Sequence, residues 1–459
     1  MKALVFERNM GRFAAARVAS SLAGSGKGVG VGPMRLKEID ELDLPGHGWV
    51  RVKPRLAGIC GSDLSTIDAT SSRYFEQIVS FPFVPGHEIV GDAVGGELDG
   101  KRVVVEPVLG CAARAIDPPC PACASGSKGR CERIAFGHLK PGLQTGYCNE
   151  TGGGWSAGLV AHTSQLHVVP EALSDEAAVM VEPTACAIHA ALSPGLGLLD
   201  GANVVVLGAG TLGLGVVAAL RHFALPATIL AIAKHPDQTR LARELGADVV
   251  AKPTEIRRAV RRVTGALAIS HTGSAGRIER LAGGADVVFD CVGSSESIDE
   301  CLSVVRPGGR IVMVGMPGTV RVDLAPLWQR EVIMSGAYAY GTEALPTGAR
   351  STFDLAFELV GAARLERLVS GWYPLECYAD ALEHAATAGR RGAVKIVFDL
   401  RRPAPRPTAP ETKQRVSGSK RGRSMSRAGR GTRTAASGPR PGATPTQAPT
   451  DGSMEGSEL

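Results

Sequence analysis

The chain has 459 residues, of which 44% are hydrophobic, and a formal net charge of +6. This length allows two domains or more with large cores, and no apolar run approaches the roughly 18 residues of a membrane span, so we expect no membrane partner. The positive charge lies at the C-terminal end. Residues 401–459 contain 12 Lys or Arg and 4 Asp or Glu. The other 400 residues contain 39 Lys or Arg and 41 Asp or Glu. The body of the chain is therefore near neutral, and a nucleic-acid partner is not favoured.

The N-terminal segment is predicted to belong to the folded protein. Met1–Glu7 is typical of a short strand and lacks the charged-then-apolar order of a secretion signal. Arg8–Leu22 is rich in Arg and Ala, as transit peptides are, but that interpretation is less favoured. Ala23–Pro33 is rich in Gly and is predicted to be a loop. The chain has ten cysteines, and their clustering indicates metal binding in a reducing compartment, which we take to be the cytoplasm.

Two short stretches of the first domain carry candidate metal ligands. Leu56–Leu64 reads Leu-Ala-Gly-Ile-Cys-Gly-Ser-Asp-Leu, and Val84–Gly91 reads Val-Pro-Gly-His-Glu-Ile-Val-Gly. Cys60, His87 and Glu88 offer a thiolate, an imidazole and a carboxylate, which is a mixture that zinc accepts. Each residue alone is more often a core or surface residue, so the stretches are informative only together.

A glycine-rich turn follows a buried strand at Asn203–Gly213, which reads Asn-Val-Val-Val-Leu-Gly-Ala-Gly-Thr-Leu-Gly. Gly208, Gly210 and Gly213 have the G-x-G-x-x-G spacing, and an apolar helix is predicted after them. Glycines at this spacing let the backbone approach a pyrophosphate at the helix N-terminus, where Thr211 and Leu212 stand. We therefore predict a dinucleotide site, whereas the alternative is a glycine turn that only packs.

Strands and helices alternate through this second domain, which predicts a doubly wound parallel sheet. The predicted strands are Val204–Leu207, Thr228–Ala233, Val287–Cys291 and Arg310–Gly315, and the predicted helices are Gly213–Phe223, Gln238–Leu245 and Ser297–Val305. Ligands bind at the carboxyl ends of such strands. Val292 and Gly315 should therefore border the nicotinamide.

The end of the second strand bears on the choice of cofactor. An acid at this point would hold the ribose 2′-hydroxyl of NAD, but Ala233 stands there and Lys234 and His235 follow. A cation without a carboxylate favours the 2′-phosphate of NADP. We therefore expect NADP in preference to NAD, with a solvated loop lysine as the alternative.

The order of these motifs resembles that of the zinc-dependent medium-chain alcohol dehydrogenases, above all the sorbitol, threonine and glucose dehydrogenase branch. Gly-Ile-Cys-Gly-Ser-Asp, Pro-Gly-His-Glu, a cysteine cluster and the Gly-rich turn follow one another within residues 1–400. The resemblance implies an α/β architecture with a β-rich GroES-like catalytic domain and a Rossmann domain. It also implies an oxidoreductase that transfers hydride between an alcohol and NAD(P), with a polyol, sugar or amino alcohol as substrate.

The resemblance implies a catalytic zinc that is held by Cys60 and His87, with water in the open position. The third protein ligand varies within the family. Here the candidates are Glu88, which follows the histidine, and Glu182 in a Val-Glu-Pro-Thr-Ala-Cys segment before the cofactor domain. Cys186 of that segment is a rival, which we interpret as a packed helix residue.

A second, structural zinc is implied by the cysteine cluster. Cys120, Cys123 and Cys131 match the last three ligands of the family's zinc lobe, but eight residues separate Cys111 from Cys120, where the family has two. A longer loop closes at small extra entropy, so four thiolates can still converge. The alternative is a lobe that has lost its metal.

Further roles are carried over from the family. Ser62 matches the hydroxyl that accepts the proton of the alcohol, and Asp63 is expected to orient a metal ligand. The next relay position, often a histidine, is Ser65 here, so the proton path through water or Thr66 stays open. Lys395 is a weak candidate for a basic residue near the cofactor phosphates. Family members are commonly dimers or tetramers, and we expect a homo-oligomer.

We expect four segments along the chain, and two other functions are the alternatives to a zinc-dependent dehydrogenase. The segments are a catalytic zinc domain over 1–180, a dinucleotide domain over 181–330, a catalytic return segment over 331–400 and a disordered basic tail over 401–459. One alternative is a zinc-free quinone or enone reductase on the same fold, which the Cys and His motifs disfavour. The other is a nucleotide-binding protein that uses its basic tail on nucleic acid.

Overall fold

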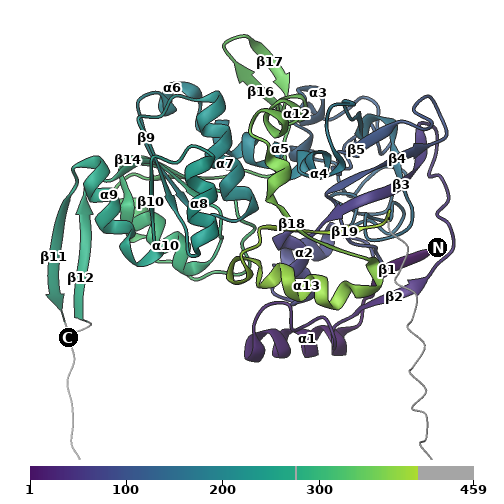
Figure 1. The fold of residues 1–459 in the computed structure, drawn as a ribbon, viewed down its shortest axis with the longest axis horizontal. Coiled ribbons are helices and arrows are strands. Elements are labelled where there is room, and N and C mark those ends of the chain that lie inside the picture. Colours follow the sequence, from purple (N-terminus) through teal and green to yellow (C-terminus); the bar gives the residue numbers. More distant parts are fainter. Residues whose placement is uncertain (274–275, 402–459) are drawn as a thin grey trace, which may run out of the picture. The chain divides into compact units, whose positions relative to one another are not determined.

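The computed structural model describes residues 1–273 and 276–401, and two large sheets organise this part of the chain (Figure 1). The predicted disordered tail lies outside the described residues from residue 402 onward. The domain limits that we expect at residues 180 and 330 stay a prediction. The fold class itself is confirmed, because a β-rich sheet and a parallel sheet flanked by helices are both present.

The first sheet draws its strands from both ends of the described chain. Its order is β18-β19-β3-β4-β5-β7, with β6 paired to β3. The strands are β3 (Trp49–Gly58), β4 (Ile89–Val94), β5 (Arg102–Val105), β6 (Leu159–His162), β7 (Leu166–Val168), β18 (Val369–Tyr373) and β19 (Lys395–Asp399). β3 and β4 are antiparallel, with Ala57 opposite Ile89. The residues just after β3 therefore meet the residues just before β4.

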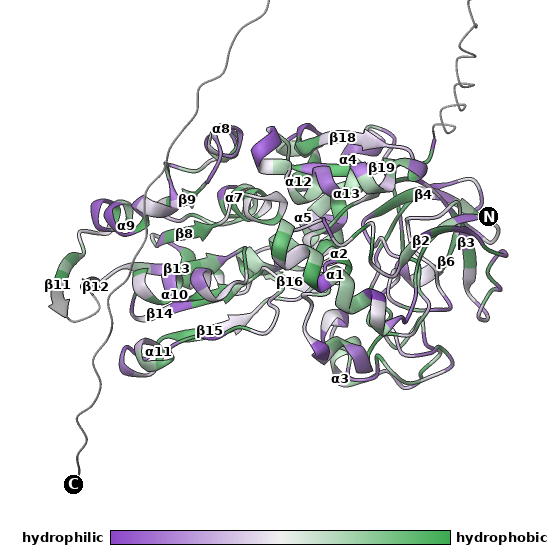
Figure 2. Ribbon diagram, turned by 90° about the horizontal axis from the view of Figure 1, so that it is seen from below, coloured by the Kyte–Doolittle hydropathy of each residue, from purple (hydrophilic) through white to green (hydrophobic). Residues whose placement is uncertain are grey.

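The second sheet is parallel throughout, in the order β10-β9-β8-β13-β14-β15. Its strands are β8 (Asn203–Leu207), β9 (Thr228–Ile232), β10 (Val249–Ala251), β13 (Ala285–Asp290), β14 (Val305–Met313) and β15 (Ile333–Gly336). This is the order of a doubly wound dinucleotide fold. Figure 2 shows hydrophobic strands β8 and β13 between more polar helices, as expected for a sheet that is covered on both faces.

Helices cover this parallel sheet and connect it to the first sheet. They are α7 (Thr211–Phe223), α8 (Pro236–Glu244), α9 (Ile256–Thr264), α10 (Ser295–Val304) and α11 (Ala325–Gln329) over the sheet, and α4 (Asp175–Val179), α5 (Val181–Leu192) and α12 (Thr352–Ala362) at the connection. The Ser174 Oγ accepts the Ala177 N–H at 3.1 Å, so the predicted cap is present. The helix expected over Asp175–Leu192 is interrupted at Met180. α5 packs against α7 and α12 and ties the two sheets together.

An N-terminal unit lies against the first sheet. β1 (Lys2–Phe6) pairs with β2 (Met34–Glu38), and the segment between them forms α1 (Met10–Ala23) and a Gly-rich turn. Two further helices lie beside it, α2 (Gly61–Ile67) and α13 (Tyr378–Ala386). Asp68, which ends α2, accepts the hydroxyls of Ser20 and Ser25 at 2.6 Å each. This buried carboxylate therefore fixes the end of α1 to α2.

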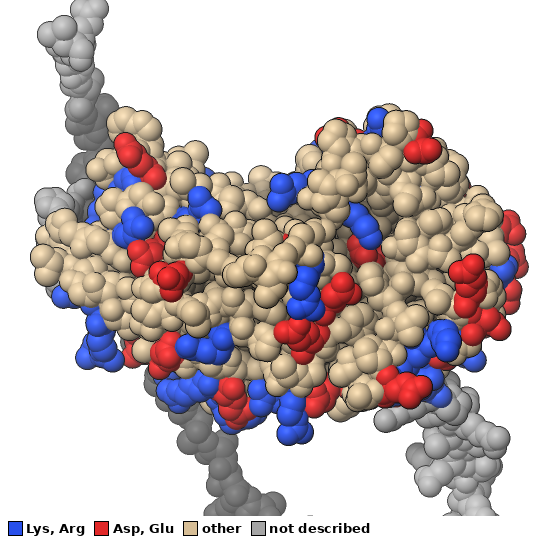
Figure 3. All heavy atoms as spheres, turned by 90° about the horizontal axis from the view of Figure 1, so that it is seen from above, with Lys and Arg blue, Asp and Glu red and all other residues tan. Residues whose placement is uncertain are grey.

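The remaining elements are short. They are α3 (Pro121–Ala124), α6 (Leu196–Leu199) and two antiparallel hairpins, β11 (Leu267–Gly273) with β12 (Gly276–Ala282) and β16 (Thr342–Leu345) with β17 (Gly348–Ser351). Within the described ranges, no helix has both the length and the apolarity to cross a bilayer. Acidic and basic side chains are interspersed on the face in Figure 3.

Candidate functional site

The pairing of β3 with β4 brings three candidate ligands together. Cys60 follows β3, and His87 and Glu88 precede β4. One ligand atom from each of the three residues lies within 4.8 Å of the others. Thiolate, imidazole and carboxylate donors at this separation suit zinc. His87 and Glu88 are buried, and all three residues line one large cleft.

Asp63 touches two of these ligands. Its Oδ2 accepts the backbone N–H of Cys60 at 3.0 Å, as a residue in the first turn of a helix can. Its Oδ1 lies 3.4 Å from the Nδ1 of His87. Burial lowers the pKa of His87, but Asp63 and Cys60 outweigh burial and raise the pKa well above its ordinary value. Asp63 therefore orients Cys60 by a hydrogen bond and places a negative charge beside the His87 ring, where it favours a cation.

Glu88 has a second partner, which is Lys395 of β19. The Lys395 Nζ lies 2.6 Å from both carboxylate oxygens of Glu88 and donates to the Ile59 carbonyl at 3.2 Å. Both side chains are almost fully buried, at 1% and 2% exposure. A Cβ on Gly58 would overlap the Glu88 carboxylate. The ammonium predicted to lie near the cofactor phosphates is therefore engaged inside the protein, because Glu88 neutralises it there.

Glu182 and Cys186 face the same cleft from α5. Glu182 is not part of the group of three ligand atoms, and its Oε1 accepts from the Cys186 Sγ at 3.5 Å. Burial raises the pKa of Glu182 to about 7. Cys186 packs against the large core cluster from α5, as predicted for a packed helix residue, and its half-buried thiol also lines the cleft.

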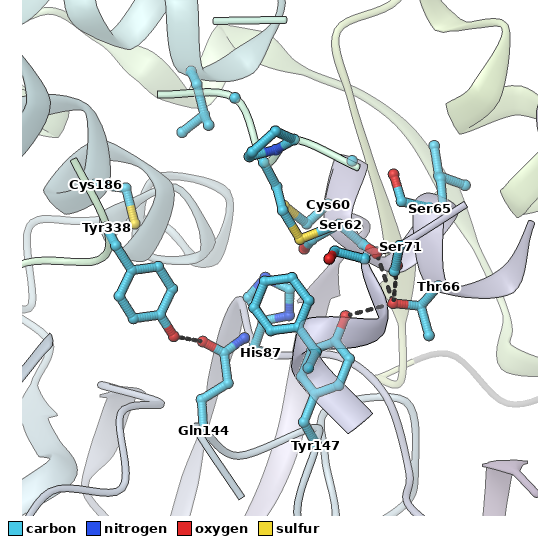
Figure 4. Close-up of a pocket in the computed structure, with 18 of the residues that line it drawn as sticks. Cys60, Ser62, Ser65, Thr66, Ser71, His87, Gln144, Tyr147, Cys186 and Tyr338 are labelled. Carbon is cyan, nitrogen blue, oxygen red and sulfur yellow. Dashed lines mark hydrogen bonds between the residues drawn. The ribbon is translucent and has the colours of Figure 1, made fainter. Parts of the chain in front are cut away.

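Hydroxyl groups form a network beside the ligands (Figure 4). The Thr66 Oγ1 lies 3.3 Å from both the Ser71 Oγ and the Tyr147 hydroxyl, and it donates to the Ser62 carbonyl at 2.9 Å. The Tyr147 hydroxyl also donates to the Asp63 Oδ1 at 3.4 Å. Burial raises the pKa of Tyr147, so this hydroxyl keeps its proton. Ser62 and Ser65 line the cleft as well.

The Gly-rich turn has the geometry that the sequence predicted. Gly208 has a φ of +98°, and a Cβ on Gly213 would overlap the Gly208 carbonyl oxygen. Gly210 is the N-cap of α7, and Thr211 and Leu212 form its first turn on the wall of the cleft. The free N–H groups of this first turn can donate hydrogen bonds to a pyrophosphate.

The carboxyl ends of the neighbouring strands complete the cofactor side. Ala233 follows β9, and the backbone N–H groups of Lys234 and His235 donate to the Gln238 Oε1 at 3.2 and 3.3 Å. Lys234 is exposed. Val292 and Gly315 follow β13 and β14 and line the cleft.

The cleft that joins these parts has a volume of about 1410 Å³. A pocket for one small ligand typically has about 300–1,000 Å³, so this volume allows two ligands. The cleft extends from the ligand group to the first turn of α7. It can therefore hold a dinucleotide and a second small molecule beside the metal ligands.

The four cysteines of the predicted lobe converge despite their unusual spacing. The sulfur atoms of Cys111, Cys120, Cys123 and Cys131 all lie within 4.8 Å of one another. Arg114, from the long interval, is fully buried and donates to five backbone carbonyls of the lobe, those of Leu109, Phe136, Leu139, Lys140 and Gly142. Arg114 therefore ties the long interval to the rest of the lobe, while Asp117, Pro118 and Pro119 stay exposed.

Part of the site carries no signal in the sequence. Tyr147, Gln144 and Tyr338 lie beside the ligands (Figure 4), and the Tyr338 hydroxyl donates to the Gln144 Oε1 at 3.3 Å. α1 also lines the cleft. None of these residues stands in a recognisable motif. Gly58, two residues before Cys60, is the one position whose residue type indicates a close neighbour. Because glycine has no side chain, the Glu88 carboxylate can approach the backbone there.

Comparisons with known proteins agree with this geometry. Residues 46–171 match the family model described as alcohol dehydrogenase GroES-like domain, and residues 211–358 match that of the zinc-binding dehydrogenases. Sorbitol dehydrogenase from Arabidopsis thaliana is 28% identical over 365 residues, which are 76% of this chain and 88% of that protein. L-idonate 5-dehydrogenase from Vitis vinifera is 29% identical over 371 residues, or 78% and 90%.

Solved structures share the fold. An alcohol dehydrogenase from Thermus sp. ATN1 superposes with a TM-score of 0.60 at 25% identity, over 87% of this chain and 100% of that chain. A 2R,3R-butanediol dehydrogenase from Bacillus subtilis gives 0.60 at 21% identity, over 87% and 99%.

Proposed function

The chain belongs to the zinc-dependent medium-chain alcohol dehydrogenase family, in the branch similar to sorbitol dehydrogenase, and we propose that its cleft oxidises an alcohol reversibly with NADP. The family's activity is hydride transfer between an alcohol and NAD(P). The observation that carries the proposal is the convergence of Cys60, His87 and Glu88 in the same cleft as the first turn of α7.

Zinc and the nicotinamide cofactor would supply the chemistry that side chains lack. When bound, zinc acts as a Lewis acid that lowers the pKa of the alcohol, and the nicotinamide accepts the hydride. The chain binds and orients both groups. Ser62, on the wall of the cleft, accepts the proton that leaves the alcohol. The Thr66 hydroxyl donates to the Ser62 backbone carbonyl and contacts the Ser71 hydroxyl at 3.3 Å, so the path onward from the Ser62 hydroxyl runs through water or Thr66.

Glu88 is our choice for the third protein ligand. Its oxygen lies within the 4.8 Å group, whereas no oxygen of Glu182 does. Lys395 compensates part of the negative charge of Glu88, which moderates the total charge of the ligand set. Glu182, with a pKa raised by burial to about 7, would act from the side of the cleft as a carboxyl beside the substrate.

NADP is the preferred cofactor in this proposal. Ala233 leaves the tip of β9 without a carboxylate, and the exposed Lys234 follows it. A carboxylate at this position would repel a 2′-phosphate, whereas a lysine attracts it.

The four-cysteine lobe is proposed to hold a second, structural zinc, which is supported by the mutual distances of its sulfur atoms.

Assembly and location are further proposals. We infer a homo-oligomer, which is supported by exposed apolar side chains on the last strand of the parallel sheet and the helix before it, Leu324, Trp328 and Ile333. Light scattering of the purified protein tests this proposal. A cytoplasmic location stays a prediction from the free cysteines.

The experiment that tests the function pairs metal analysis with an alcohol panel. We expect two zinc ions per chain and alcohol-dependent reduction of NADP faster than of NAD, measured at the nicotinamide absorbance. A protein that holds no zinc but reduces quinones or enones would support the zinc-free alternative instead. Truncation after residue 401 should leave turnover unchanged, whereas a protein that works through its basic tail would lose its partner.

A further inference from the structure

A series of aromatic rings starts at the metal-ligand group and continues along the wall of the cleft. The His87 ring lies 6.1 Å from that of Tyr147, which lies 5.2 Å from Phe83. Phe83 in turn lies 5.2 Å from Phe81 and 5.1 Å from Phe6. All five residues line the cleft. The series therefore gives the cleft an apolar face that begins beside the reacting centre.

Helix α1 extends this apolar face on the outer side. Met10, Phe13, Ala14 and Arg17 line the cleft from one side of the helix, whereas the exposed Val18 and Leu22 are not among its lining residues. Phe13 packs against the same core cluster as Phe81 and Phe75. Asp68 holds the C-terminal end of α1, because it accepts from Ser20, Ser25 and the Gly26 N–H. The helix is thus a fixed part of the wall, which Figure 1 shows next to α2 and α13.

Hydroxyl groups gather beside the metal ligands at the inner end of the cleft, while the charged side chains of Arg17, Arg73 and Glu76 also belong to the lining of the cleft. The Thr66 hydroxyl bonds to those of Ser71 and Tyr147 near the ligands, and Ser62 lies there too (Figure 4). A carbinol oxygen finds donors and acceptors at this end. Hydroxyls farther along a polyol would face the Phe83 and Phe81 rings and lose hydrogen bonds to water without replacement, which is costly.

We propose that the substrate is a secondary alcohol that carries an apolar, preferably flat, arm, with the carbinol at the metal ligands and the arm along the aromatic face as far as α1. This proposal rests on the proposed dehydrogenase function and narrows its substrate class. Phe13 and Ala14 then determine which arm fits. Aromatic rings pack favourably on other rings at such distances, and burial of the arm removes apolar surface from water.

Three alcohols and two neighbouring substitutions test the proposal in the full-length, zinc-loaded protein. The alcohols are 1-phenylethanol, 2-propanol and sorbitol, each assayed with both cofactors. Ala14 and Ala15 are both exposed, but only Ala14 lines the cleft, so Ala14→Trp narrows the cleft and Ala15→Trp places the same ring outside it. Phe13→Ala is a third variant, which removes an apolar side chain from the wall of the cleft instead of adding bulk.

For the wild type, we expect kcat/KM for 1-phenylethanol to exceed those for 2-propanol and sorbitol by about tenfold or more. Ala14→Trp should lower the value for 1-phenylethanol by about tenfold and leave 2-propanol within about twofold, while Ala15→Trp changes neither. Phe13→Ala should also lower only the value for 1-phenylethanol. A higher kcat/KM for sorbitol than for 1-phenylethanol would overturn the proposal. So would Ala14→Trp and Phe13→Ala variants in which kcat/KM for 1-phenylethanol and for 2-propanol change by the same factor. Failure to oxidise any alcohol would instead contradict the dehydrogenase function itself.

Discussion

Both carboxylate oxygens of Glu88 lie 2.6 Å from the Nζ of Lys395, and the two residues come from opposite ends of the described chain. β19 pairs with β3 in the first sheet, which carries the lysine to the metal-ligand group. Nearly complete burial makes this ion pair costly to break on one side, because the remaining charge would be left without a partner.

Lys395→Met should therefore lower the free energy of unfolding by about 3–5 kcal/mol, measured by urea denaturation of the zinc-free protein. Lys27→Met is the matched control. It removes a lysine from an exposed pair with Glu383, and such pairs contribute at most about 1 kcal/mol. Equal losses in the two variants would contradict the burial argument.

Glu88→Gln and Glu182→Gln separate the two candidates for the third ligand. Loss of a zinc ligand should weaken zinc binding by more than about 100-fold. Loss of a residue that only hydrogen-bonds to a ligand usually weakens metal binding by about 10- to 100-fold. We expect the larger loss for Glu88→Gln and a change of at most about tenfold for Glu182→Gln. Competition with a chromophoric chelator measures both affinities. The reverse order would assign the third ligand to Glu182.

The preference for NADP depends on a short segment after β9. Lys234→Ala should lower the ratio of kcat/KM for NADP to that for NAD by about tenfold. This factor corresponds to about 1.4 kcal/mol, the energy expected from one lysine–phosphate charge pair in a solvated site. Ala233→Asp should lower the ratio further because it adds repulsion. Lys252→Ala, another exposed lysine after a neighbouring strand, is the control. An unchanged ratio in the first two variants would remove the basis for NADP.

Asp175 links α4 to three arginines, and its role depends on pH. Its oxygens accept from Arg55 at 2.9 Å, Arg102 at 3.2 Å and Arg401 at 2.8 Å. Burial raises the pKa of Asp175, but Arg55 and Arg401 outweigh burial and hold the pKa below its ordinary value of 3.8. The carboxylate therefore adds stability above that value, and this contribution is lost as the pH falls through the lowered pKa.

Asp175→Asn should accordingly cost about 2 kcal/mol of unfolding free energy at neutral pH, a moderate figure because the arginines are partly exposed. The difference from the wild type should shrink below about pH 4. Denaturation curves between pH 3 and 7 measure it, with Asp354→Asn, an exposed position, as the control. A difference that stays constant down to pH 3 would exclude the ion pairs as its source.

Local patterns predicted much of the fold but little of the outer cleft. The parallel sheet and the glycine turn follow from hydrophobic runs and from the spacing of Gly208 and Gly213, and both depend on neighbours in sequence. The Glu88–Lys395 pair joins residues 307 positions apart, so no local sequence pattern could predict it. The segment Arg8–Leu22 was interpreted from its composition alone, whereas its contribution to the cleft depends on Asp68 and on the core beneath Phe13.

The most direct test of the account is the zinc content and turnover of Cys60→Ser, measured together with NADPH binding by fluorescence. We expect one zinc ion fewer per chain than in the wild type, loss of alcohol oxidation and an unchanged dissociation constant for NADPH, because the Gly-rich turn is remote from the substituted side chain in sequence and lies on the other sheet. Full zinc content with full turnover in this variant would contradict the central claim.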